Sequence, residues 1–375
     1  MLNISNIVKN NRVKKFLFGL FFLIIFLASA SAGFLYLNFK KVFVNGPNGS
    51  FPSPSPPISD PYAPYNILLL GYGGEGHQGG TLADSLIVAH IQPKKMRVTL
   101  ISVPRDTWVL LPIRSDIRQN YKINASYAIG SDDIKYALKE PQYKGEAGGG
   151  EMAKYAVNQV TGLPIDYFIS ISFDGFRQAI DILGGVEVDV PVAFVDNFYP
   201  IKGRENDTCG KSAAEINKLQ NLYSDTKLHQ QFECRYEQIQ FDAGKKLMDG
   251  ETALKFARSR ASAQHGGDFA RSQRQQEVLL GIKDKIISIG ALDDIVPFIN
   301  KIADTVRTDM DVAVISQLLE TQGSPGEYEI QTVNLSEENV FVSSISTDGQ
   351  FILIPKEGDG IFSGVHTYIK EQIGK

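Results

Sequence analysis

The chain has 375 residues, of which 43% are hydrophobic, 21% are charged and only 2 are cysteines. This ordinary globular composition excludes a wholly disordered chain, a collagen-like repeat and a small disulfide-dense scaffold. The formal net charge is −4, but residues 1–43 carry six cations and no acid, which leaves 32 cations against 42 anions in the rest. The chain after residue 43 is therefore too acidic to form the dense cationic face that non-specific nucleic-acid binding requires. No nucleic-acid partner is expected.

The first predicted element is a single transmembrane helix at residues 16–37, a run of 22 residues without a charged side chain. At about 1.5 Å per residue, this run can cross a hydrocarbon core roughly 30 Å thick. Four cations precede it and two follow it, so residues 1–15 are predicted to be a cytoplasmic tail and the body to be extracytoplasmic, at the cell membrane. A cleaved signal peptide is the alternative, because residues 28–32 are small, but the apolar run resumes at 34–37.

A proline-rich linker is predicted at residues 38–65. Seven of the 17 prolines lie within residues 45–65. Such a stretch cannot pack a core and forms an extended, semi-rigid spacer. We therefore expect a folded domain to begin at Asn66, held away from the membrane.

From residue 66 onward, strand-like and helix-like stretches alternate. Strands are expected at 66–70, 85–92, 97–103, 166–171 and 186–190, and helices at 151–161, 173–183 and two or three times between 245 and 303. This order predicts an α/β fold, a layered α-β-α domain with a central mixed sheet over residues 66–308. Residues 309–375 contain a helix, two strand-like runs (328–333 and 340–354) and a final helix. They form either an extension or the completion of this domain.

Two cysteines, Cys209 and Cys234, lie in a polar insert at residues 204–236. Outside the cytoplasm, two cysteines in one poorly packed insert are expected to form a disulfide bond. A catalytic thiol or a metal site is less favoured, because neither cysteine lies in a nucleophile motif and two cysteines make an incomplete metal site.

Arginines cluster near the end of the predicted domain. Four fall within 17 residues of this acidic body: Arg258, Arg260, Arg271 and Arg274. The guanidinium group binds phosphate oxygens in bidentate fashion and stays charged at any relevant pH. Asp268 is expected to cap a helix that carries Arg271, Arg274 and Gln275 on one face, near an N-terminus that attracts anions. The pattern indicates a diphosphate clamp, with a solvated basic helix face as the alternative.

Charged residues also stand at the ends of two predicted strands. Pro104 ends one strand, so Arg105 and Asp106 project from its C-terminal edge, where open α/β sheets bind ligands. Asp84 begins the neighbouring strand, after a glycine-rich loop at residues 71–81 that lacks the signatures of dinucleotide and phosphate loops. A carboxylate beside arginines can hold Mg²⁺ against phosphate oxygens. A turn-capping aspartate is the alternative.

Five sequence blocks, in order, resemble the LytR-CpsA-Psr family. They are NILLLGYGGEGHQGGTLADSLIVAHIQPKKMRVTLISVPRDTWV from Asn66, KINASYA from Lys122, IDYFISISFDGFRQAIDILGGVEVDVP from Ile165, LMDGETALKFARSR from Leu247 and DFARSQRQQ from Asp268. The resemblance extends from Asn66 to about Ile287, behind the predicted membrane anchor.

This resemblance implies an extracytoplasmic phosphotransferase that takes a glycopolymer from a polyprenyl diphosphate carrier and joins it to peptidoglycan through a phosphodiester bond. The family motifs place the diphosphate on Arg105, Arg258, Arg260, Arg271 and Gln275. They assign Mg²⁺ to Asp84, and they imply an apolar tunnel between sheet and helices for the polyprenyl tail. Our mechanistic hypothesis gives the proton of the acceptor hydroxyl to Asp84 or Asp106.

Two positions depart from the family pattern. Gly73 stands where many members have an aspartate, and Leu82 stands where many have an arginine. A second acidic metal ligand is therefore missing, unless Glu75 or His77 replaces it. Three alternatives stay open: a hydrolase of the lipid diphosphate, a non-catalytic protein that binds it, and a membrane-bound transcriptional attenuator. The acidic outer body and the short cytoplasmic tail count against the attenuator.

Overall fold

The computed structural model describes residues 60, 62–74, 80–223, 227–228, 230–288, 306–310, 314 and 328–374. The predicted tail at 1–15, the predicted membrane helix at 16–37 and nearly all of the linker at 38–65 lie outside these residues, as do Glu75 and His77. Among the residues that are described, no helix has the length and apolar character needed to span a membrane.

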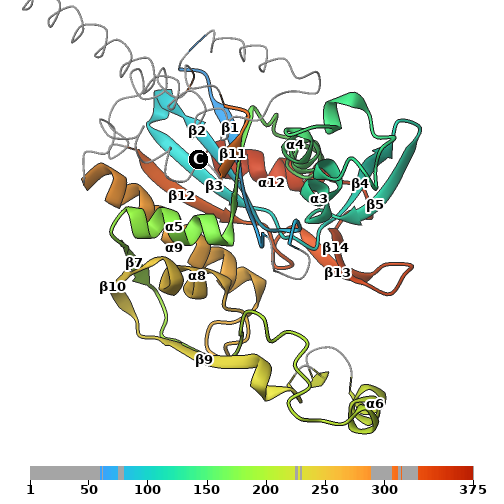
Figure 1. The fold of residues 1–375 in the computed structure, drawn as a ribbon. Helices are drawn as coiled ribbons and strands as arrows, with labels where there is room; N and C mark the ends of the chain where they lie inside the picture. Colours follow the sequence, from blue (N-terminus) through green and yellow to red (C-terminus); the bar gives the residue numbers. More distant parts are fainter. Residues whose placement is uncertain are drawn as a thin grey trace, which may run out of the picture.

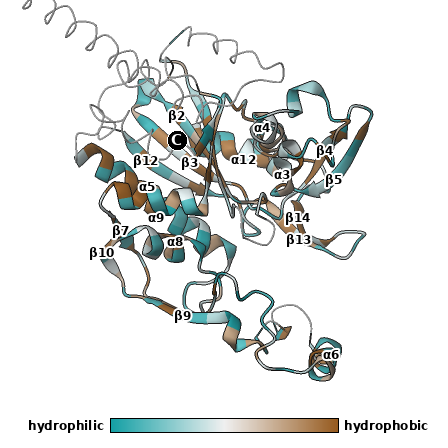
Figure 2. Ribbon diagram, in the orientation of Figure 1, coloured by the Kyte–Doolittle hydropathy of each residue, from teal (hydrophilic) through white to brown (hydrophobic). Residues whose placement is uncertain are grey.

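A six-stranded mixed sheet lies at the centre of the fold (Figure 1), in the strand order β11-β6-β1-β2-β3-β12. The strands are β1 (Tyr65–Tyr72), β2 (Ala83–Gln92), β3 (Arg97–Ser102), β6 (Tyr167–Ser172), β11 (Val306–Thr308) and β12 (Glu329–Asn334). β1 pairs parallel with β6 and β3 parallel with β12, whereas β2 runs antiparallel to both β1 and β3. Figure 2 shows hydrophobic stretches along the sheet and on α12 (Ser363–Gly374). The predicted central mixed sheet is confirmed.

One face of the sheet is covered by α3 (Ala125–Ser131), α4 (Gly148–Thr161), α12 and the hairpin of β4 (Trp108–Arg114) and β5 (Ile117–Lys122). Leu68, Val88 and Ile101 of the sheet pack with α4 and α12 in one buried cluster. At Gly150 of α4, an added Cβ would lie 2.2 Å from the Phe168 ring of β6. The helix can lie this close to the sheet because this position has no side chain.

The other face is covered by α5 (Phe173–Ile182), α8 (Gly250–Arg258) and α9 (Gly267–Ser288), which lie side by side in Figure 1. Behind these helices lie β7 (Val186–Val190) and β10 (Gly244–Met248), which pair antiparallel. Ser172 caps α5 by accepting a hydrogen bond from the Gly175 amide, and Gly184 and Gly185 follow the helix with φ of 74° and 86°. The predicted helix and its glycine stop are therefore both found.

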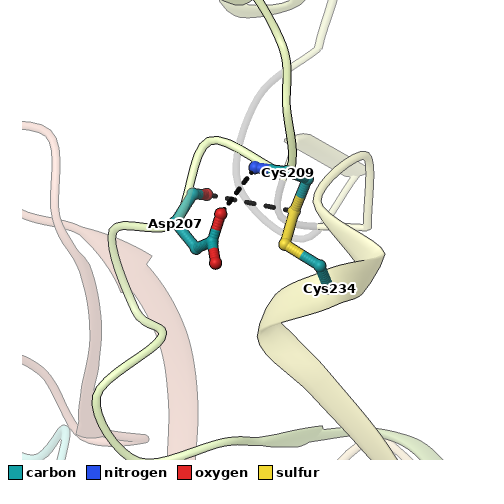
Figure 3. Close-up of side chains that lie close together, drawn as sticks. All are labelled: Asp207, Cys209 and Cys234. Carbon is teal, nitrogen blue, oxygen red and sulfur yellow. Dashed lines mark hydrogen bonds between the residues drawn. A yellow bond between two sulfur atoms is a disulfide. The ribbon is translucent and has the colours of Figure 1, made fainter.

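A long extension leaves this side of the molecule through β8 (Phe194–Pro200) and β9 (Tyr236–Phe241) and carries α6 (Ala213–Leu222) at its far end (Figure 1). Cys209 and Cys234 are joined within it by a disulfide bond, which is the predicted pairing. Figure 3 shows Asp207 beside this bond, where its carboxylate accepts a hydrogen bond of 2.8 Å from the Cys209 amide. Because both sulfurs are in the disulfide, this group is not a metal site.

The C-terminal part completes the central domain rather than extending from it, since β12 is an edge strand of the sheet. The expected strand at 340–354 is a hairpin of β13 (Phe341–Ile345) and β14 (Phe351–Pro355). A second difference concerns Asp268. The helix α9 begins at Gly267, so Asp268 lies inside its first turn, and the expectation that it precedes the helix as a cap is wrong. Several elements had no counterpart among those expected from the sequence: α3, β4, β5, α6, β8, β9, β10 and β11.

Candidate functional site

Four arginines meet around one cavity of about 620 Å³. Arg105 follows β3, Arg258 ends α8, Arg260 lies in the loop after α8, and Arg271 lies in the first turns of α9. The residues of this cavity that sequence analysis assigned to the ligand are Asp84, Arg105, Arg258, Arg260, Arg271 and Gln275. We call this space the arginine cavity. The predicted diphosphate residues are thus brought to one place from four separate segments.

Sheet topology brings Asp84 to Arg105. Because β2 runs antiparallel to β3, the start of β2 lies beside the end of β3. Arg105 Nη1 donates to Asp84 Oδ1 at 2.5 Å, and Arg105 Nε lies 3.5 Å from the Asp106 carboxylate. Burial lowers the pKa of Arg105, but Asp84, Asp106 and Asp268 together raise it above its ordinary value. The guanidinium is therefore firmly charged and is held between two carboxylates.

Asp106 is more enclosed than Asp84. Its side chain is 10% exposed and accepts a 2.7 Å hydrogen bond from Lys122 Nζ, whereas the Asp84 side chain is 34% exposed. Asp106 lines a neighbouring cavity but not the arginine cavity, whereas Asp84 lines both. Of the two carboxylates proposed to accept a proton, Asp84 is the one that faces a ligand among the arginines.

Asp268 joins two of the arginines and was not predicted as a site residue. Its carboxylate accepts from Arg260 Nη2 at 2.7 Å and lies 3.0 Å from Arg271 Nη2. Burial raises the pKa of Asp268, but Arg271, Arg260 and Arg105 lower it below its ordinary value overall. Asp268 and Arg271 are three residues apart in one helix, a spacing that favours an ion pair. The sequence contained this signal, but Asp268 was interpreted as a helix cap.

Arg271 is the most buried of the four arginines, with its side chain 8% exposed. Burial lowers its pKa to about 10, assisted by Arg260 and Arg105 and opposed by Asp268. It therefore stays protonated near neutral pH. Its Nε is enclosed and has no hydrogen-bond partner among the described residues. A buried N–H without an acceptor is costly, so this group favours an anionic ligand.

Aromatic rings hold Arg258. Its guanidinium carbon lies 4.3 Å from the centre of the Phe173 ring and 5.8 Å from that of Tyr199, and its Nη1 donates to the Tyr199 hydroxyl at 3.3 Å. Stacking of this kind keeps the planar group in one orientation. Phe173 and Tyr199 were not singled out as site residues from the sequence, because they come from α5 and β8, far from Arg258 along the chain.

Gln275 and Arg274 have different roles although they are adjacent. Gln275 lines the arginine cavity, and its Oε1 accepts from Ser85 Oγ at 3.0 Å. Arg274 is fully buried and donates to the carbonyl oxygens of Phe256 at 2.9 Å, His265 at 2.7 Å and Ser259. Arg274 therefore holds the loop between α8 and α9, and the expectation that it joins the diphosphate clamp is wrong.

An apolar cavity of about 420 Å³ adjoins the arginine cavity, between the sheet and α5, α8 and α9. Its walls include Ile169 and Ile171 of β6 and Leu279 and Ile282 of α9. The residues that line both cavities are Ser85, Phe173, Arg258 and Gln275. The two spaces together suit an amphiphile with an anionic head and a hydrocarbon tail.

The residues near Asp84 fit a magnesium ion that takes most of its ligands from water and substrate phosphates rather than from the protein. Mg²⁺ is usually bound by one or two carboxylates together with water and substrate phosphates. Asp84 supplies one carboxylate and Ser85 a neighbouring hydroxyl, and Gly73 at the end of β1 supplies no side chain. Over the described part of the chain, three potential ligand atoms gather only at Asp207, Cys209 and Cys234.

Known proteins share this architecture. The model of the LytR_cpsA_psr family matches residues 48–355. The polyisoprenyl-teichoic acid–peptidoglycan teichoic acid transferase TagV of Bacillus subtilis is 25% identical over 76% of this chain and 59% of its own length. The transferase TagU of Enterococcus faecalis is 25% identical over 66% of this chain and 62% of its own length. This chain therefore spans about three fifths of the length of these relatives.

A solved structure agrees with the family match. The crystal structure of B. subtilis TagV superposes with a TM-score of 0.53 at 23% identity, over 84% of this chain and 98% of that one. At this level of identity the likeness shows a shared fold. With the family model matched over most of its length, this chain belongs to the LytR_cpsA_psr family.

Proposed function

We propose that this protein transfers a glycopolymer from a polyprenyl diphosphate carrier to peptidoglycan through a phosphodiester bond. The observation that carries this proposal is the arginine cavity with an apolar cavity directly beside it. A polyprenyl diphosphate has a charged head and a hydrocarbon tail that match these two spaces. The names of TagV and TagU give polyisoprenyl-teichoic acid and peptidoglycan as the substrates of those relatives, which supports the same substrate classes here.

The arginines bind and orient the diphosphate. Four guanidinium groups (Arg105, Arg258, Arg260 and Arg271) line the cavity with the carboxylates of Asp84 and Asp196. Asp268 pairs with Arg260 and Arg271 from outside this lining, so the cluster keeps an excess of positive charge. Phosphoryl transfer depends mainly on positioning and on stabilising the charge that develops at the phosphorus. Gln275 and Ser85 support this arrangement from the junction with the apolar cavity.

The transfer itself is a substitution at phosphorus. The acceptor hydroxyl oxygen forms a bond to the sugar-proximal phosphorus, and the bond from that phosphorus to the bridging oxygen breaks. Polyprenyl phosphate leaves with the electron pair of that bond. The hydroxyl proton passes to one of the two carboxylates beside Arg105, Asp84 or Asp106. Arg105 stabilises the negative charge on the phosphoryl oxygens throughout.

We further propose that Asp84 holds Mg²⁺ and that the protein acts at the outer face of the cell membrane, anchored by residues 16–37. Bound magnesium would neutralise charge on the diphosphate oxygens. A non-catalytic lipid-diphosphate binding protein is the second candidate. The observation in its favour is Gly73, which leaves Asp84 without a second carboxylate at the end of β1.

Product analysis tests this proposal. The full chain in detergent micelles is mixed with Mg²⁺, a labelled polyprenyl-diphosphate glycan and uncrosslinked peptidoglycan oligomers, and the products are identified by mass spectrometry. Label joined covalently to the oligomer is the expected result. Free phosphoglycan would instead show a hydrolase, and intact donor that stays bound to the protein would show a binding protein.

A further inference from the structure

A third cavity, of about 270 Å³, is also lined by the pair formed by Asp84 and Arg105. It shares six residues with the arginine cavity: Asp84, Ser85, Arg105, Gly267, Arg271 and Gln275. The two spaces therefore meet along one wall, and that wall is the part of the protein assigned to the diphosphate.

The fold builds the far side of this cavity from the C-terminal part of the chain. β14 runs beside the segment after β3, where Thr107 bridges to Leu353 and the Leu353 amide donates to the Asp106 carbonyl at 2.9 Å. This pairing places Phe351 at the cavity wall, which Phe269 from the first turn of α9 also lines. Both rings are unusually open to solvent, with Phe351 47% exposed and Phe269 42% exposed.

The charges of this cavity differ from those of the arginine cavity. It lacks Arg258 and Arg260, and Asp106, Asp268 and Glu337 line it. Carboxylates repel a second anion, but they accept hydrogen bonds from hydroxyl groups. Exposed aromatic rings offer flat apolar surfaces beside these acceptors. A ligand with many hydroxyl groups, an apolar ring face and little negative charge suits this combination.

Two observations point to the acceptor rather than the donor. Asp84 and Asp106, the two carboxylates placed to accept a proton, both line this cavity, whereas the arginine cavity contains only Asp84. The attacking hydroxyl must lie within hydrogen-bond reach of the base. Phe173 and Arg258, which join the apolar cavity to the arginine cavity, do not line this third space. The proposed function assigns the carrier lipid and its diphosphate to the other two cavities.

We propose that this third cavity binds the saccharide acceptor of peptidoglycan, with Phe269 and Phe351 packing against sugar rings and Glu337 accepting hydroxyl hydrogen bonds. The identity of the acceptor rests on the proposed function above. Phe269 and Phe351 are here substrate-contacting residues, and neither was assigned a role from the sequence, although Phe269 lies within the block that begins at Asp268.

Steady-state kinetics with the full chain tests this proposal. The F269A/F351A double variant removes two exposed rings, so the fold should be retained. We expect its KM for uncrosslinked peptidoglycan oligomers to rise about tenfold, with the donor KM unchanged, because two aromatic packing contacts are lost. The I345A variant is the matched control, since Ile345 lies on the same hairpin, is 66% exposed and lines none of the three cavities. The single variant Phe351→Tyr retains the ring, so its acceptor KM should equal that of the wild type.

A rise in the donor KM instead would show that the cavity holds the donor glycan, and unchanged values for both substrates would show that it holds neither. Either result overturns the proposal. Calorimetric titration with the same peptidoglycan oligomer tests the proposed acceptor site separately from the proposed transfer activity. Oligomer binding that depends on Phe269 and Phe351, without any transfer by the wild type, would support the site and contradict the proposed activity. Transfer by the wild type with normal oligomer binding by the double variant would contradict the site alone.

Discussion

The contrast between Arg271 and Arg274 shows what decides the role of a single residue. Both are arginines of α9, and they lie three positions apart. Arg271 lines the arginine cavity and has an Nε without a protein acceptor among the described residues. Arg274 instead donates to three carbonyl oxygens of the α8 end and the loop after it. The acceptors already present in the protein therefore determine which arginine is available to a ligand.

Arg105 is the residue whose loss should affect transfer most. Arg105→Ala removes a preorganised donor at the wall shared by the arginine cavity and the third cavity. We expect the transfer rate to fall by a factor on the order of 10² or more, as for loss of one oxyanion donor elsewhere. The measurement is kcat with saturating donor and acceptor. Arg114→Ala is the control, since Arg114 pairs with Asp116 at the surface. A folded Arg105→Ala protein with a near-normal rate would contradict the assignment.

The two carboxylates beside Arg105 should differ in their response to magnesium. Asp84→Asn removes the proposed metal ligand, so we expect a slower reaction whose rate no longer depends on the Mg²⁺ concentration. Asp106→Asn leaves Asp84 in place and removes the partner of Lys122. It should slow transfer without changing the Mg²⁺ concentration for half-maximal rate. Identical magnesium titrations for Asp84→Asn and wild type would disprove the metal assignment.

At the scale of elements, α9 links the charged and apolar halves of the site. Its first turns carry Asp268 and Arg271, and further along it Val278, Leu279 and Ile282 line the apolar cavity. The helix lies very close to β7, because an added Cβ at Gly281 would lie 2.5 Å from the Glu187 carbonyl oxygen. Gly281 therefore allows α9 to pack closely on β7.

Gly281→Ala should destabilise the protein. The new methyl group overlaps backbone atoms of β7, which cannot rotate away as a flexible side chain could. We expect a loss of about 1–3 kcal/mol in the free energy of unfolding, typical of overpacking. Chemical denaturation measures this change. Gly374→Ala is the control, because its added Cβ meets nothing within 4 Å in α12. Equal stability of the two variants would be inconsistent with this contact.

Filling the apolar cavity should weaken binding of the carrier tail. Ala179 of α5 lines that cavity, so Ala179→Phe would occupy part of its volume. We expect weaker affinity for polyprenyl diphosphate but unchanged affinity for a diphosphate with a two-isoprene chain. Gln178→Phe is the control, since Gln178 is the exposed neighbour on the same helix. Equal losses for long and short chains would argue against a tail in this cavity.

At the scale of the whole molecule, the described domain and its extension are stabilised by different means. The central sheet buries large apolar clusters on both of its faces. In the extension, no residue of α6 is buried. Two parts of the extension are joined by the Cys209–Cys234 disulfide, whose cysteines have a sequence separation of 25. A disulfide stabilises such a segment mainly by restricting its unfolded conformations.

Removal of this disulfide should therefore have a local effect. In a C209S/C234S variant we expect faster amide hydrogen exchange in α6 and unchanged exchange in the central strands β1 and β2. Hydrogen-exchange mass spectrometry on the full chain measures both regions at once. Reduction of the wild type should reproduce the result. Faster exchange in β1 and β2 would show instead that the extension and the sheet unfold together.

Sequence alone determined the class of the fold and most of the central strands, because aliphatic and β-branched runs such as residues 66–70 and 97–103 are buried strands on local grounds. The strand β5 was missed for a physical reason. β5 buries none of its residues, so its pattern carries little local signal and its structure depends on pairing with β4.

The types of the site residues were also determined by the sequence: arginines in an acidic chain, with Asp84 and Arg105 at strand ends. Only the tertiary structure decided which charges meet. It joined Asp268 to Arg260 and Arg271 and stacked Arg258 on Phe173. It also directed the Arg274 side chain to carbonyl oxygens of the α8 end and the loop after it, and brought Phe351 to a cavity that Arg105 also lines. Apart from the Asp268–Arg271 pair, which is three residues apart in one helix, these contacts depend on how separate elements pack and on the side-chain directions that packing sets, so no local pattern encodes them.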